Sequence, residues 1–380
     1  MRFNAIYFLS LSLLLTALCG CKTPKLSEAN EQMERGEFFN AAKTYRAVYN
    51  KLSPKNEREL RGVVAYRLAT CYRRLNQAPR ASAAYQNAIR YEYPDSMAFY
   101  YLGRSLQAEG KYNPAIDAYT AFLEWRPDDV LAKEGIRGCR KAIRAKGEPK
   151  SRYIVRNAKI FNSQRSDFAP MYLDKTLNTI YFTSSTEKAT GTNKSEITGT
   201  KKSDIFFSTK NERGEWQRPE PAEGELNTDA DEGVVSFSPD GQTMYLTMAR
   251  RSLNSDTSVE IYTSRRSDAS WSAPQKYEIT ADTLSAYGHP AVSPDGTYLY
   301  FCSDMPGGFG GKDIWRINLK SPTGSLENMG EQINTSGDEM FPYVRTDSLL
   351  YFSSDGHPGF GGLDLFRATL NSTGQRWSVE

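Results

Sequence analysis

Few side chains in this sequence have the chemistry of an active site. Histidine occurs twice among the 380 residues, at His289 and His357, and each one precedes a proline. Sites that bind a metal ion through several histidines, such as those of zinc peptidases, are therefore excluded, and a Ser/His/Asp hydrolase would have only two candidate bases. We interpret both histidines as turn residues. The sequence predicts no catalytic residue, no cofactor and no metal site, and hence a protein that is not an enzyme.

Two short patterns imitate ligand-binding motifs. Residues 307–312 read GGFGGK, as in a phosphate-binding loop, but Asp313 follows the lysine and the next segment has the pattern of a strand. A phosphate loop needs Ser or Thr there and the N-terminus of a helix, so these glycines are predicted to form a tight connection between strands. Asn227, Asp229 and Asp231 could bind Ca²⁺, but they lack the spacing of an EF-hand. We interpret them as a solvated connection.

The N-terminus has the pattern of an export signal. Arg2 precedes an uncharged run over residues 5–18, which would rise only about 21 Å as a helix, short of the ~30 Å hydrocarbon core of a membrane. The run ends in Leu-Cys-Gly-Cys, which resembles the lipobox of bacterial lipoproteins, with Cys19 where Ala, Ser or Thr is usual. This resemblance implies a signal peptide over residues 1–20 and lipidation of Cys21. An ordinary secretory signal is the alternative.

The residue after Cys21 is Lys rather than Asp. By the same resemblance, the protein is anchored in the outer membrane through its lipid and faces the periplasm. Three other cysteines, Cys71, Cys139 and Cys302, remain after cleavage. They cannot all pair with one another even in an oxidising compartment, and their spacing matches no metal motif. We predict that they are buried free thiols.

A pattern repeats every 34 residues through the first part of the chain. Ala81 recurs as Ala115 and Tyr85 as Tyr119, and an earlier copy lies upstream with about six inserted residues. Small residues allow two helices to approach closely, and the aromatic residues fill the space between neighbouring hairpins. The pattern resembles tetratricopeptide repeats, which implies an α-solenoid of about three repeats closed by a capping helix over residues 130–146.

In tetratricopeptide proteins the first helix of each repeat lines a groove for extended peptides. The positions of this chain that match the family's groove are Tyr66, Thr70, Arg73, Arg74, Tyr100, Arg104 and Gln107. Residues 22–150 contain 24 Lys and Arg against 15 Asp and Glu, a net charge of +9, whereas the residues after them carry −7. A basic groove suits an acidic peptide or chain terminus of another envelope protein. The alternative is that these arginines form a solvated helix face.

A second pattern repeats about every 55 residues after a Gly-Glu-Pro break at 147–149. Four apolar segments centred on a tyrosine are each followed by an alternating segment that begins near Asp or Glu. These eight strands are predicted at 179–185, 204–209, 243–249, 260–265, 298–304, 313–318, 349–355 and 364–369. Such spacing is typical of propeller blades, with a β-sandwich as the alternative. Ser-Pro-Asp-Gly turns at 238–241 and 293–296 resemble the TolB-like, WD40-like (PD40) propeller repeat of bacterial envelope proteins.

The expected organisation is therefore a multidomain α plus all-β protein. A tetratricopeptide solenoid occupies residues 21–148, and a propeller of at least four blades occupies 149–380. Residues 152–162 resemble a strand that leads into later blades and are expected to complete the final blade. In a propeller of four blades, residues 377–380 would compete with them for that edge.

A Trp followed three residues later by Pro recurs at Trp216 and Trp271, and a third copy at Trp377 has Glu380 at the proline position. Because the chain stops inside this third copy, we expect further blades beyond Glu380.

The order of lipobox, tetratricopeptide repeats and propeller resembles envelope lipoproteins of Bacteroidetes. The PorE-like, OmpA-family group of the type IX secretion and gliding machinery is the most similar. This resemblance implies an outer-membrane scaffold linked to peptidoglycan through a further C-terminal domain. One alternative is a propeller enzyme such as a glycoside hydrolase with paired carboxylates, and another is a TolB-like accessory protein that binds a peptide in the periplasm. The formal charge of +3 gives no reason to expect nucleic-acid binding.

Overall fold

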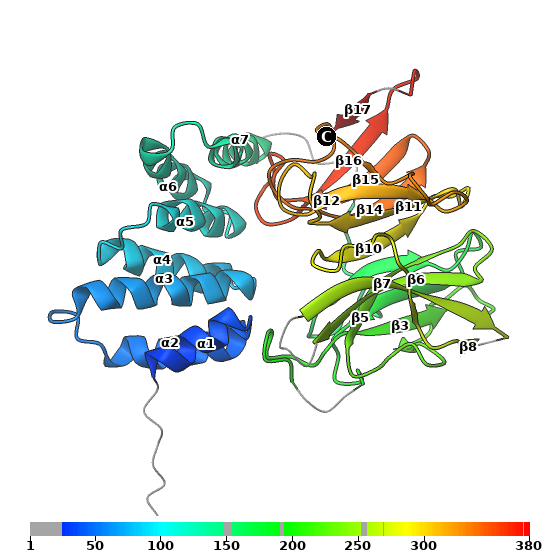
Figure 1. Cartoon of the computed structure of the whole chain (residues 1–380), viewed down its shortest axis with the longest axis horizontal. Coiled ribbons are helices and arrows are strands. Elements are labelled where there is room, and N and C mark those ends of the chain that lie inside the picture. Colours follow the sequence, from blue (N-terminus) through cyan, green and yellow to red (C-terminus); the bar gives the residue numbers. More distant parts are fainter. Residues whose placement is uncertain (1–24, 147–153, 191–193, 252–256, 269, 375) are drawn as a thin grey trace, which may run out of the picture.

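The computed structural model describes residues 25–146, 154–190, 194–251, 257–268, 270–374 and 376–380. The predicted signal peptide, Cys21 and the break at 147–149 lie outside the described residues. Within these ranges a stack of helices lies beside four antiparallel sheets arranged as propeller blades (Figure 1). No helix of this part of the chain has the length and apolar character needed to cross a membrane.

The helices form the predicted solenoid, in which each one packs against the next in chain order. They are α1 Leu26–Glu34, α2 Phe38–Lys51, α3 Arg58–Arg74, α4 Ala78–Arg90, α5 Met97–Ala108, α6 Tyr112–Trp125 and α7 Val130–Ala145. Tyr45, Tyr85 and Tyr119 occupy the same position in α2, α4 and α6 and are fully buried. A Cβ atom on Gly103 would lie 2.8 Å from the ring of Tyr119, so this position of α5 must be small.

The sheets contain all eight predicted strands. Blade 1 has β1 Asp167–Tyr172, β2 Thr179–Ser184, β3 Asp204–Thr209 and β4 Glu220–Pro221, and blade 2 has β5 Asp231–Phe237, β6 Thr243–Arg251, β7 Thr257–Ser267, β8 Ser270–Trp271 and β9 Gln275–Lys276. Blade 3 has β10 Tyr287–Val292, β11 Tyr298–Ser303, β12 Asp313–Asn318 and β13 Glu327–Asn328, and blade 4 has β14 Glu339–Thr346, β15 Leu349–Ser354, β16 Asp364–Leu370 and β17 Trp377–Val379. The inner strands β1, β5, β10 and β14 pack side by side in this order.

Every inner strand has an irregular register around a residue with positive φ. These residues are Ala169, Val234, His289 and Phe341. The backbone N–H of Val234 donates to Oγ1 of Thr183, and that of His289 donates to Oγ1 of Thr247, each at 2.8 Å. A bulge thus turns a backbone donor towards the preceding blade. The prediction that His289 is a turn residue is wrong, because it lies inside β10, whereas His357 lies in a connection as predicted.

An asparagine fastens two of the three junctions between consecutive blades. The side chain of Asn227 in the segment before β5 accepts from the backbone N–H of Ile205 in β3 at 2.8 Å and donates to its carbonyl oxygen at 3.0 Å. Asn334 makes the same two bonds, at 2.8 and 3.0 Å, to Ile314 in β12. We call this pair of bonds the asparagine clamp. It gives the backbone N–H an acceptor and adds a second donor to the carbonyl oxygen, which also accepts from the backbone N–H of Ala222 in blade 1 and of Met329 in blade 3.

The clamp corrects one interpretation from the sequence. Asn227 and Asp231 do not belong to a solvated connection, because Asp231 also accepts a 2.9 Å bond from the backbone N–H of Ser203 in blade 1. Asp229 is exposed, as expected. The junction between blades 2 and 3 combines an apolar cluster that contains Ile261 and Tyr287 with the bond from His289 to Thr247.

The segment 154–162 does not complete the final blade. It contains no strand, and Ile154 and Val155 are exposed. The outer strand of blade 4 is β17, which pairs with β16 through Trp377 and Leu370. The C-terminal strand β17, and not the segment 154–162, therefore occupies the outer edge of blade 4.

Asn334→Ala is expected to lower the free energy of unfolding by about 1–3 kcal/mol, because it leaves the buried backbone N–H of Ile314 without its side-chain acceptor and removes one of the two donors to the Ile314 carbonyl oxygen. Urea unfolding followed by tryptophan fluorescence measures this change. Asn162→Ala is the matched control, because Asn162 lies five residues before Asp167 of β1, as Asn334 lies five residues before Glu339 of β14, but is exposed. It should change stability by less than about 0.5 kcal/mol. Equal losses in the two variants would contradict the role of the clamp.

The buried carboxyl of Glu232, at the start of β5, gives the junction of blades 1 and 2 a pH dependence. Burial raises the pKa of Glu232 to about 7 from its ordinary 4.5. A carboxyl with a raised pKa favours the folded state fully below pH 4.5, and this contribution is lost as the pH rises through 7. Glu232→Gln should remove this loss of stability with rising pH. The melting temperatures of the wild type and the variant should therefore diverge between pH 4.5 and 7. Parallel curves would contradict the prediction.

Candidate partner-binding groove

The predicted groove residues lie on α3 and α5, the first helices of two neighbouring repeats. In α3, Tyr66 stacks on Tyr93 with ring centroids 4.3 Å apart, and the Thr70 hydroxyl donates to the Tyr66 carbonyl at 3.0 Å. Burial raises the pKa of Tyr66, so this phenol stays neutral. These two side chains are thus tied to the solenoid and give the groove its shape.

The two arginines at the end of α3 each lie against an aromatic ring. The guanidinium of Arg73 lies 4.1 Å from the ring centroid of Tyr101 and is half-buried, and Arg74 is exposed with its guanidinium 5.8 Å from the ring of Phe38. Such cation–π contacts orient an arginine without neutralising it. This half of the groove therefore offers positive charge on an aromatic floor.

The other half of the groove is covered by the chain itself. Arg104 of α5 forms an ion pair with Asp355 of blade 4, with Nη2 and Oδ2 2.5 Å apart. Gln107 donates from Nε2 to the carbonyl oxygen of Gly359 at 3.0 Å and accepts from the Tyr119 hydroxyl at 2.7 Å. We call residues 355–361 the blade 4 loop. The third-repeat positions Arg104 and Gln107 therefore bind that loop.

Backbone geometry allows the blade 4 loop to come this close to the helices. A Cβ atom on Gly138 of α7 would lie 2.3 Å from the carbonyl oxygen of Gly359, so a larger residue there would push the loop away. Gly361 has φ +125° and lies against the backbone of Ala108. Both positions require glycine, for space in the first case and for conformation in the second.

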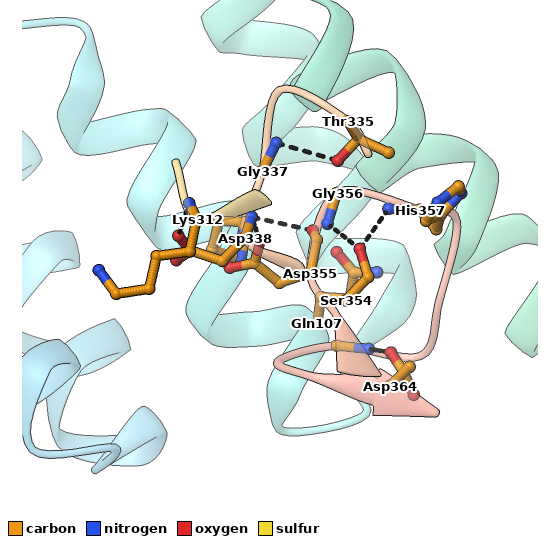
Figure 2. A network of polar contacts seen from close by, with 12 residues as sticks. Gln107, Lys312, Thr335, Gly337, Asp338, Ser354, Asp355, Gly356, His357 and Asp364 are labelled. Carbon is orange, nitrogen blue, oxygen red and sulfur yellow. Dashed lines mark hydrogen bonds and ion pairs between the residues drawn. The ribbon is translucent and has the colours of Figure 1, made fainter. Parts of the chain in front are cut away.

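The loop is also held from within blade 4 (Figure 2). Ser354 Oγ accepts from the backbone N–H groups of Gly356 and His357 at 3.0 and 3.2 Å. Asp355 Oδ1 accepts from the backbone N–H of Asp338 at 2.9 Å, while Asp364 accepts from that of Gly361. These bonds give the loop one conformation before it meets the solenoid, which lowers the entropy cost of the contact.

The ion pair between the domains is largely shielded from water. The Arg104 side chain is 22% exposed and that of Asp355 is 21% exposed. Burial lowers the pKa of Arg104, but the charge of Asp355, the phenols of Tyr100 and Tyr119 and the hydrogen bond to Asp355 together raise that pKa above the usual range. Tyr100, buried beside it, accepts a longer bond from Nη1 at 3.4 Å. Arg104 therefore remains charged and paired.

A second contact joins the other end of the solenoid to blade 1. The backbone N–H of Phe39 in α2 donates to the carbonyl oxygen of Ile197 at 3.1 Å. The Phe39 ring lies against Gly199, where a Cβ atom would be 2.3 Å from it. The solenoid thus touches the first and the last of the four blades (Figure 1).

The remaining nucleophilic groups are buried and unreactive. Cys71, Cys139 and Cys302 are free and buried, which confirms the prediction from the sequence. The Cys302 sulfur lies 3.3 Å from Nδ1 of His289. Burial raises the pKa of Cys302 to about 12 and lowers that of His289 to about 3, so the pair holds neither a thiolate nor an imidazolium at neutral pH.

Sequence reasoning missed the blade 4 loop as the occupant of the groove. Its acidic Asp355 does fit the predicted preference for acidic segments, but nothing in the pattern pointed to this segment of the chain. Residues 104 and 355 are 251 positions apart. The two parts that meet were predicted separately, as a groove position and as a strand connection.

Arg104→Met is expected to open the contact between the domains. It leaves Asp355 without its cation and should lower the free energy of unfolding by about 1–3 kcal/mol. Hydrogen exchange of residues 355–361 should become faster, because the loop loses its main anchor on α5. Arg58→Met is the control, since the Arg58–Glu92 pair is exposed on the same solenoid. Unchanged exchange in Arg104→Met would contradict the prediction.

Comparisons with known proteins agree with the helical part of this description. The Tetratricopeptide repeat family matches residues 64–96 and 97–128, and no curated protein matches the chain. One similar solved structure is the C-terminal TPR-containing domain of a Plasmodium falciparum FK506-binding protein, with 17% identity, a TM-score of 0.29, and coverage of 32% of this chain and 88% of that one. Another is the first TPR of Spaghetti (RPAP3) bound to an HSP90 peptide, with 21% identity, a TM-score of 0.27, and coverage of 32% and 90%.

The propeller region has similarities of the same low level. A thermostable family-43 glycoside hydrolase is 13% identical, with a TM-score of 0.31 and coverage of 56% of this chain and 74% of that one. The family match is the specific finding, because its two segments coincide with the hairpins α3–α4 and α5–α6. Residues 64–128 therefore contain two tetratricopeptide repeats, and this chain carries a tetratricopeptide solenoid beside a propeller-like array of four blades.

Proposed function

We propose that this protein is a non-enzymatic scaffold that holds protein partners together in the bacterial envelope. The observation that carries the proposal is the contact between its two interaction folds, formed by Arg104 with Asp355 and by Gln107 with Gly359. A scaffold must fix the relative positions of its binding surfaces. Two separate contacts between solenoid and propeller serve that purpose, because they restrain rotation as well as separation.

The half of the groove on α3 is the proposed docking site. Arg73 and Arg74 supply charge, and Tyr66 and Tyr101 supply aromatic surface beside it. The contact with the blade 4 loop supports an acidic ligand. In the neighbouring repeat, Arg104 and Gln107 already donate hydrogen bonds to a carboxylate and to a backbone carbonyl of this irregular segment. The proposed partner is an acidic peptide or chain terminus of another envelope protein.

The location and the cellular system rest on the resemblances in the sequence. Lipidation of Cys21 would fix the protein to the periplasmic side of the outer membrane, since two or three acyl chains anchor stably. The similarity to PorE-like, OmpA-family lipoproteins supports a place in type IX secretion or gliding, with a link to peptidoglycan. The carboxylates at the blade junctions support a role outside catalysis. Glu339, for example, is buried and accepts from Thr335 and Ser354.

The groove proposal predicts that a double variant, Arg73→Glu with Arg74→Glu, loses its partner. Reversal of both charges on α3 should reduce partner recovery at least about fivefold after crosslinking in cells and affinity purification, because the groove would repel an acidic segment. Arg58→Glu is the matched control, since it lies at the opposite end of the same helix. Equal recovery from wild type and double variant would contradict the acidic-groove proposal.

The membrane proposal is tested in the same cells. Cys21→Ser should move the full chain from the outer-membrane fraction to the soluble fraction. An unchanged distribution would contradict lipid anchoring without bearing on the groove.

A further inference from the structure

The segment that leads into a blade carries a recurrent motif of an apolar residue, Asn, and Thr or Ser, with an acidic residue four positions after the hydroxyl. It occurs at residues 161–167, 226–232 and 333–339. In the third copy, Thr335 donates from its backbone and from Oγ1 to the Glu339 carboxylate, both at 2.7 Å. In the first copy, Ser163 donates in the same way to Asp167 at 2.6 and 2.8 Å. The motif therefore folds the same way in both places.

Two copies of this motif dock on the preceding blade through the asparagine clamp, and the residue they clamp is always the second of its strand. Asn227 clamps Ile205, which follows Asp204 in β3, and Asn334 clamps Ile314, which follows Asp313 in β12. Both isoleucines are 0% exposed. The clamp and the burial of this side chain go together.

Blade 4 has the same docking position, but no asparagine among the described residues clamps it. Leu365 follows Asp364 in β16, pairs with Ser353 as Ile314 pairs with Cys302, and is 74% exposed. Tyr343 of β14 is 38% exposed, whereas Ala291, at the same position of blade 3, is 1% exposed. We call Tyr343, Tyr351 and Leu365 the free face of blade 4.

The first copy of the motif does not fill this face. Asn162 is exposed, and its Nδ2 donates to Asn157 at 3.3 Å rather than to a strand of another blade. Phe161 beside it packs against Phe182 and Trp216 of blade 1. The docking position at Leu365 and the side chain of Asn162 are thus both accessible in the described structure.

We propose that the free face of blade 4 is a docking surface for a polypeptide that carries this motif, as the leading strand of a further blade that these four blades do not supply. Its asparagine side chain accepts from the backbone N–H of Leu365 and donates to the carbonyl of Leu365. Its apolar residue and inner strand cover Leu365 and Tyr343. The occupant is defined by what covers the equivalent face of blade 3, where Ile333 and Val344 pack with Ile314 and Ala291.

A labelled peptide with the sequence of residues 330–346 is the probe, and the full chain is the receptor. Fluorescence anisotropy should show saturable binding, and a peptide with Asn replaced by Ala at the position of Asn334 should bind at least about tenfold more weakly, because two hydrogen bonds are lost. Leu365→Asp in the chain should weaken binding by a similar factor. Leu284→Asp is the control, because Leu284 is 96% exposed in the connection before β10 and lies outside the free face.

Three results would overturn the proposal. They are no saturable binding up to millimolar peptide, equal binding of the Asn and Ala peptides, and undiminished binding to a Leu365→Asp chain whose circular dichroism and melting temperature match the wild type. Sedimentation velocity tests whether a second copy of the chain occupies the free face instead. If the chain alone forms dimers that Asn162→Ala abolishes, the face belongs to a second copy, and the assignment to a further partner blade is wrong.

Discussion

Each blade depends on its neighbour to bury one face of its sheet. Ile205 and Ile314 are inaccessible to solvent because the next blade covers them, whereas Leu365 at the same position of the last blade is 74% exposed. The backbone N–H groups of Ile205 and Ile314 also need an acceptor, which the asparagine side chain supplies. The asparagine clamp solves both problems at once, because it satisfies the backbone and fixes the register of the covering strand. Packing and polar pairing therefore act at one point of each clamped junction.

The solenoid adds a restraint of a different kind. It contacts blade 1 through Phe39 and Ile197 and blade 4 through Arg104 and Asp355. A rigid helical stack that touches both ends of the blade array sets the distance between them. A change in the spacing of these blades must bend the solenoid or break one contact. Because tetratricopeptide repeats contact only their neighbours, such bending would fall between α2 and α5, where the groove lies.

Local periodicity was sufficient to predict most of the fold. The 34-residue period located α3 to α6, and the alternation around Tyr181 and Tyr300 located β2 and β11. The errors concern residues whose role depends on another blade. The local sequence of Asn227 is that of a loop, and only the folded chain brings Ile205 to its side chain. His289 precedes a proline as a turn residue would, but it lies in the bulge of β10. The encounter of Arg104 with Asp355 was equally hidden, since a groove position and a strand connection carry no shared pattern.

The blade 4 loop connects the groove to the propeller by a continuous path. The backbone N–H of Lys312 in blade 3 donates to Asp338, and the backbone N–H of Asp338 donates to Asp355 (Figure 2). Asp355 in turn pairs with Arg104 on α5. Asp355 uses one carboxylate oxygen for the propeller and the other for the solenoid. An acidic ligand that took Arg104 from Asp355 would leave this half-buried carboxylate with backbone donors alone. Occupation of the third-repeat half of the groove therefore acts against the junction of blades 3 and 4, while a ligand confined to Arg73 and Arg74 leaves that junction intact.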